Sequence, residues 1–170
     1  FRSFLILVPE FCRLLEAYFL HGRIFHLAFN MYAFYNLGQF VEQYFGGKTL
    51  FMAYIFTAIT GSTLSFLMSL LGLWQNQGLP NGLSISVGAS GAIFGLVGLV
   101  LGNKFWKKNT YSPEINIDTN GLWIFVIINL VIGFGFNLLG SGMYINNWAH
   151  LGGLFGGLLL GAVINIKSTF

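Results

Sequence analysis

The chain has 170 residues, of which 55% are hydrophobic and only 8% are charged. About a quarter of the residues in soluble domains are charged, so this composition indicates a membrane protein. The net charge of +3 is too small to favour nucleic acid as a partner, and a single cysteine, Cys12, excludes an internal disulfide bond and a cysteine-based metal site.

Residues 1–23 mix short apolar runs with scattered charges. The chain starts at Phe1 and the run FLILV at 4–8 is too short to span a bilayer, so we expect a fragment of a longer protein. Mixed segments of this kind are typical of elements that lie in the membrane interface. We therefore interpret residues 1–23 as a membrane-embedded loop region.

Five apolar stretches follow, separated by turns that contain polar residues, glycine or proline. They predict helices at about 24–41, 50–74, 88–103, 121–139 and 148–166. No charged residue occurs between Lys48 and Lys104 or between Asp118 and Lys167, so each interval can hold two spans. Continuous apolar runs without polar alternation exclude a β-barrel. The predicted fold class is an all-α polytopic membrane protein.

Lysines set the expected orientation of these spans. If the spans alternate in direction, the turns that lie on one side carry Lys48, Lys104, Lys107, Lys108 and Lys167. The loops 75–87 and 140–147, on the other side, contain no lysine or arginine. Because positive charge marks the cytoplasmic side, the starts of the first, third and fifth spans are expected to face the non-cytoplasmic side.

Small residues recur every three or four positions in the third and fifth spans, which predicts that these two helices pack closely. The two stripes are Gly91, Gly95, Gly98 and Gly102 in the third span, and Ala149, Gly153, Gly157 and Gly161 in the fifth. Ser90 immediately precedes the first stripe, and His150 follows the first residue of the second. Packing of the stripes in register would make Ser90 and His150 neighbours.

A serine beside a histidine suggests nucleophilic catalysis, because imidazole can take the hydroxyl proton. Ser90 at a helix N-terminus would offer its backbone N–H to an oxyanion, and His26 and Asn30, four residues apart, could add donors from one helical face. No Asp or Glu is expected at the depth of His150, so the pattern predicts a dyad rather than a triad.

Each of these residues also has a purely structural interpretation. A serine in a membrane helix often bonds to a carbonyl one turn earlier, and a histidine at a helix end often bonds to a loop carbonyl. His26 and Asn30 could form a cap or an interhelical pair. A three-histidine metal site from His21, His26 and His150 lacks an HExxH motif and an acidic ligand, so neither a metal nor another cofactor is expected.

Three motifs carry a family resemblance: HGRIFHLAFN at 21–30, GASG at 88–91 and NWAHLGGLFGG at 147–157. With these motifs the sequence resembles the rhomboid intramembrane serine proteases along almost all of its length. The resemblance implies one membrane domain over residues 1–170, a rhomboid-like helical bundle with five spans of a six-helix core and the first helix missing from this chain.

For the site, the resemblance implies Ser90 as nucleophile, His150 as general base and then acid, and an oxyanion site of the Ser90 backbone N–H, His26 and Asn30. Phe94 stands where many members have tyrosine, and its ring can stack on His150. The implied substrates are single-span membrane proteins, cleaved in or near the lipid bilayer at a site open to the non-cytoplasmic side. We also expect the fourth span, which contains Gly133 and Gly135, to act as a mobile gate.

Two other functions stay open. The first is a non-catalytic rhomboid-like protein that binds membrane clients without cleaving them. The second is a small transporter or channel, which would need polar groups along a path at several depths, whereas here they gather at one end. The sequence specifies neither an oligomeric state nor a natural substrate.

Overall fold

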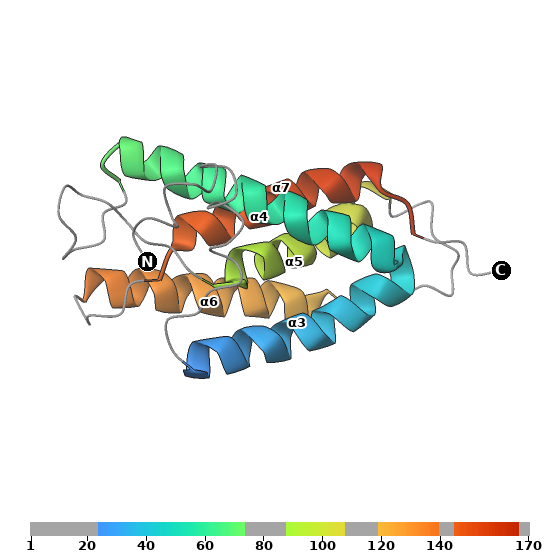
Figure 1. Ribbon diagram of the computed structural model, residues 1–170, viewed down its shortest axis with the longest axis horizontal. Coiled ribbons are helices and arrows are strands. Elements are labelled where there is room, and N and C mark those ends of the chain that lie inside the picture. Colours follow the sequence, from blue (N-terminus) through green and yellow to red (C-terminus); the bar gives the residue numbers. More distant parts are fainter. Residues whose placement is uncertain (1–23, 74–87, 108–118, 140–144, 167–170) are drawn as a thin grey trace, which may run out of the picture.

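The computed structural model describes residues 24–73, 88–107, 119–139 and 145–166. They form a bundle of helices, labelled in Figure 1: α3 (Ile24–Phe45), α4 (Gly47–Leu70), α5 (Ser90–Lys107), α6 (Asn120–Leu138) and α7 (Asn147–Val163). The predicted all-α fold is confirmed, with one helix over each of the five predicted ranges. The loop region 1–23, with His21, lies outside the described residues, as do Lys108 and Lys167.

Several helix boundaries differ from the predicted ones: α4 spans Gly47–Leu70 rather than 50–74, α5 ends at Lys107 rather than at 103, and α7 ends at Val163 rather than at 166. Two further differences have identifiable backbone reasons. Helix α5 begins at Ser90 rather than at residue 88, because Gly88 has a φ of 122°, which no helical residue adopts. Helix α3 continues to Phe45, four residues beyond its predicted end, and stops where Gly46 turns the chain with a φ of 90°. The structure thus leaves Ser90 in the first turn of α5.

Helix α5 lies at the centre of the bundle and contacts each of the other described helices (Figure 1). Its residues from Gly91 to Asn103 are all buried. By length and hydropathy, α4 and α6 are the described helices that could cross a bilayer, and the shorter α5 is also apolar. The exposed faces are strongly apolar as well: Phe25 and Phe29 of α3 are 75% and 74% exposed. Such a surface fits a lipid environment.

Helices α5 and α7 touch through their backbones. A Cβ at Gly153 would collide with the Gly91 carbonyl oxygen, and a Cβ at Gly157 would collide with that of Gly95. Gly161 approaches the backbone of Leu99 and Asn103 in the same way. Because neighbouring glycines one helical turn apart meet successive turns of α5, the two stripes pack in register.

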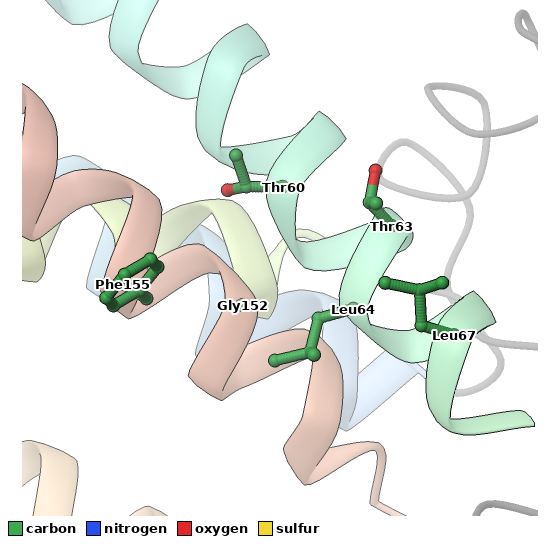
Figure 2. A pocket seen from close by; sticks show the side chains of 6 residues that line it. All are labelled: Thr60, Thr63, Leu64, Leu67, Gly152 and Phe155. Carbon is green, nitrogen blue, oxygen red and sulfur yellow. The ribbon is translucent and has the colours of Figure 1, made fainter. Parts of the chain in front are cut away.

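A second glycine face on α7, which the sequence analysis did not identify, packs on α4. A Cβ at Gly152 would lie 2.7 Å from the Thr60 carbonyl oxygen, and a Cβ at Gly156 would collide with the Thr60 side chain. Between these helices lies an open apolar groove of about 350 Å³, shown in Figure 2, whose lining residues are Thr60, Thr63, Leu64, Leu67, Gly152 and Phe155. None of the predicted site residues lines this groove.

Helix α6 is the most loosely attached, with only Val126 and Gly133 buried. Gly133 lies against the Asn147 carboxamide, whereas a Cβ at Gly135 would meet nothing within 4 Å. Gly133 is therefore a packing residue in this structure, and the gate stays a prediction. At the end of α6, the Asn137 side chain bonds to both backbone groups of Ile145 at 2.8 and 3.1 Å.

We expect Gly157→Ala to lower the free energy of unfolding by about 2 kcal/mol, because its methyl group has no room beside the α5 backbone. Gly135→Ala is the matched control, since it adds the same methyl group to a helix glycine in open space. Unfolding of both variants in detergent micelles, followed by circular dichroism, measures the difference. Equal stabilities of the two variants would contradict the packing register.

Candidate active site

The first turns of α5 and α7 bring a hydroxyl and an imidazole together. Asn146 caps α7 by accepting a hydrogen bond from the Ala149 backbone N–H at 3.1 Å, which fixes the start of that helix. His150 lies in the first turn that follows, 5% exposed, and its Nε2 is 2.8 Å from the Ser90 Oγ. The structure therefore places the two residues at hydrogen-bond distance, as the glycine register requires.

A second contact of Asn146 joins the start of α7 to α4. Its Nδ2 donates to the Ser65 Oγ at 2.6 Å, and Ser65 is buried. The side chain that caps α7 is thus itself fixed by a neighbouring helix. This arrangement restrains the position of His150 along the axis of the bundle.

An aromatic ring packs against one face of the imidazole. The Phe94 ring, one turn after Ser90, stacks on His150 with centroids 4.3 Å apart and planes 5° apart. Phe94 is 1% exposed and also contacts Phe125 of α6, at a centroid distance of 5.3 Å. The predicted stacking residue therefore lies between α6 and the imidazole and restricts rotation of the ring.

His26 and Asn30 face the short stretch that leads into α5. A Cβ at Gly88 would lie 2.8 Å from the His26 Nε2 and 3.5 Å from the Asn30 Nδ2. Both side chains therefore reach the backbone two residues before Ser90. Asn30 is 6% exposed, and its Nδ2 has no hydrogen-bond partner among the described residues. Its amide is a buried donor that points at the site.

Gly88 is part of this site, although the sequence analysis gave it no role. Its φ of 122° is strained for any residue with a side chain, and its missing Cβ leaves the space that the His26 ring occupies. Its position in the motif GASG was the available signal. A glycine two residues before a candidate nucleophile indicates a close approach of another group to the backbone.

Charged groups are far from this cluster within the described residues. Glu42, their only carboxylate, lies near the C-terminus of α3, at the opposite end of that helix from His26. No three His, Cys, Asp or Glu side chains gather among the described residues in a way that could hold a metal ion. The described site consists of a serine, two histidines, an asparagine amide and backbone groups.

Comparison with known proteins agrees with the family resemblance of the sequence. The family model of the Rhomboid domain matches residues 8–167. The protein named Rhomboid protease GluP from Bacillus subtilis (strain 168) is 35% identical over 165 residues, which are 97% of this chain and 28% of that protein. RHOMBOID-like protein 7 from Arabidopsis thaliana is 36% identical over 159 residues, or 93% of this chain and 44% of that protein.

Another Arabidopsis thaliana relative carries the name Inactive RHOMBOID-like protein 8 and is 32% identical over 144 residues, or 85% of this chain and 35% of that protein. The chain spans less than half the length of each of these three curated relatives. Since the family model matches nearly all of the chain and the helical bundle fits it, the chain belongs to the membrane-embedded rhomboid family.

Proposed function

We propose that this protein is a serine endopeptidase that hydrolyses peptide bonds in or near the membrane-spanning segments of other proteins. The observation that carries the proposal is the 2.8 Å distance between the Ser90 Oγ and the His150 Nε2 at the N-terminus of a buried helix. Intramembrane polar groups are costly, so such a pair supports a functional role. The similarity to a relative named a rhomboid protease adds to this support.

In the proposed reaction the Ser90 hydroxyl attacks the scissile carbonyl carbon while His150 Nε2 takes the hydroxyl proton. His150 then gives this proton to the leaving amine as the carbon–nitrogen bond breaks. A water molecule attacks the remaining ester, with His150 again as base, and releases the carboxylate product and the serine. The sequence of steps needs no metal and no cofactor.

The negative oxygen that forms on the carbonyl needs donors. The Ser90 backbone N–H is at a helix N-terminus, where amide groups have no partner in their own helix and the helix dipole favours negative charge. His26 and the Asn30 amide face Gly88 beside it. These three groups form the proposed oxyanion site.

The placement of the site supports membrane proteins as substrates. In Figure 1 the N-terminus of α5 lies further toward the middle of the molecule than the neighbouring ends of α4 and α6. A substrate must therefore insert its scissile peptide bond into the bundle to reach Ser90. This favours an extended segment of a single-span membrane protein as the substrate. Lys48 near the start of α4 and Lys104 near the end of α5 lie at the opposite end of the bundle, which supports a site that opens to the non-cytoplasmic side.

The competing function is that of a non-catalytic protein that binds membrane clients. A relative named as inactive is 32% identical, so the fold by itself does not imply catalysis. The hydroxyl and imidazole at hydrogen-bond distance favour the protease, because a client-binding protein has no need of this pair.

We expect a fluorophosphonate probe to label the natural full-length protein in detergent at Ser90. Both Ser90→Ala and His150→Ala should lower the labelling rate at least about a thousandfold, because each removes half of the nucleophile–base pair. Circular dichroism shows whether each variant stays folded. A folded wild-type protein that takes no label would overturn the protease and favour the client-binding function.

Gly88→Ala should lower the labelling rate at least about tenfold, because the added methyl group occupies the space of the His26 ring and disturbs the oxyanion donors. Gly121→Ala is the control, since a Cβ at Gly121 meets nothing within 4 Å. Labelling rates of the two variants are compared with that of the wild type. An unchanged labelling rate in Gly88→Ala would show that the contact between Gly88 and His26 has no part in the mechanism.

The labelling rate should fall as the pH is lowered, because a protonated imidazole cannot accept the serine proton. Below the midpoint of this acidic limb we expect about a tenfold loss for each pH unit, as for a single essential base. The measurement is the initial labelling rate of the wild-type protein across the acidic and neutral range. A rate that stays flat from about pH 4 to pH 8 would argue against a neutral histidine as the base.

A further inference from the structure

Two buried polar atoms on one face of α7 have no hydrogen-bond partner among the described residues: Asn147 Oδ1 and His150 Nδ1. Asn147 is 1% exposed and His150 is 5% exposed, so bulk water does not satisfy either atom. Residues three positions apart are neighbours on a helix surface. The two residues that carry these unpaired atoms are therefore neighbours on one face of α7.

The Asn147 carboxamide has a defined orientation. Its Nδ2 donates to the Leu130 carbonyl oxygen of α6 at 3.3 Å, which identifies Oδ1 as the free acceptor. Gly133 allows this approach, because any Cβ there would collide with the carboxamide. Helices α6 and α7 thus hold the side chain so that its oxygen has no partner in either helix.

The proposed mechanism requires one particular tautomer of His150. Nε2 can accept the Ser90 proton only when it carries no hydrogen, so in the neutral ring the hydrogen must be on Nδ1. In a catalytic triad a carboxylate accepts that N–H and fixes the tautomer. Among the described residues no carboxylate is near His150, because Glu42 lies at the far end of α3.

We propose that Asn147 is a positioning residue for His150, with its Oδ1 accepting, through one bridging water molecule, the hydrogen bond that Nδ1–H donates. This inference rests on the proposed function. A buried water molecule typically links polar groups that would otherwise be unsatisfied, and these two atoms give it one donor and one acceptor. The asparagine amide thereby takes the orienting role of a triad carboxylate without placing a charge in the membrane.

Few titratable groups can interfere with a test by pH. On α3 the titratable side chains are His26, Tyr32, Tyr35, Glu42 and Tyr44, of which His26 lies at the site beside Gly88. Helices α6 and α7 carry no titratable residue besides His150, and the lysines of α4 and α5 lie at the opposite end of the bundle. Tyr54, the tyrosine of α4, lies in the first half of that helix, away from the end that carries Ser65 and contacts Asn146. A shift in the pH profile after a charge is introduced at residue 147 can therefore be assigned to its effect on His150.

The test uses two substitutions in the natural full-length protein and the pH profile of fluorophosphonate labelling. Asn147→Leu keeps the branched shape of the side chain and removes the acceptor, so we expect the labelling rate to fall at least about tenfold. Asn147→Asp keeps an acceptor, so it should retain labelling at neutral pH, while its negative charge favours the imidazolium and moves the acidic limb to higher pH by about one unit.

Asn137→Leu is the control for loosening of α6. It removes both hydrogen bonds that join α6 to Ile145, two residues before α7, without touching the imidazole, so it should lower stability and leave the pH profile in place. Variants of Asn147 that keep the wild-type rate and profile, or that differ from wild type only as Asn137→Leu does, would overturn the positioning role. If the wild type itself takes no label, the proposed function is what fails.

A second measurement needs no substitution at residue 147. Nitrogen NMR of the wild-type protein with labelled histidine, assigned with His150→Ala, reports which ring nitrogen carries the hydrogen. The inference predicts a hydrogen on Nδ1 of neutral His150. A hydrogen on Nε2 would overturn the inference, even if the Asn147 variants fail to fold.

Discussion

The backbone contact between α5 and α7 determines where the candidate site residues Ser90 and His150 lie. Gly153 and Gly157 meet the carbonyl oxygens of Gly91 and Gly95, and no side chain fits between them. Sliding one helix along the other by a single residue would place bulky side chains against backbone. The same contact therefore fixes the positions of Ser90 and His150 along the helix axes, because Ser90 directly precedes Gly91 and His150 directly follows Ala149 in the two small-residue stripes.

Polar side chains also join the helices of the bundle. Asn103 donates to the carbonyl oxygens of Gly161 and Ile164, which joins the end of α5 to the end of α7. The Thr57 hydroxyl of α4 donates to the Ala53 carbonyl oxygen of its own helix at 2.7 Å and lies 3.3 Å from the Ala92 carbonyl oxygen of α5. Asn146 joins α7 to α4. In lipid, apolar surfaces give helices little reason to associate, so close glycine contacts and such hydrogen bonds provide the attachment.

Much of the site could be predicted because it depends on spacing along helices. A small residue at every fourth position predicts which faces meet, and His26 and Asn30 at the same spacing predict a shared face. Gly88 and Asn147 escaped prediction for physical reasons. The role of Gly88 depends on a backbone angle and on the approach of another helix, and that of Asn147 depends on the orientation of one amide beside Gly133. Neither leaves a periodic pattern in the sequence.

A crystal structure of the protein after reaction with a fluorophosphonate would examine the whole arrangement at once. The bundle described here predicts a phosphorus atom bonded to the Ser90 Oγ, His150 still stacked on Phe94, and the phosphoryl oxygen within hydrogen-bond distance of the Ser90 backbone N–H and the Asn30 Nδ2. A phosphorus atom on another side chain, or a phosphoryl oxygen directed away from Gly88 and Asn30, would contradict the proposed site.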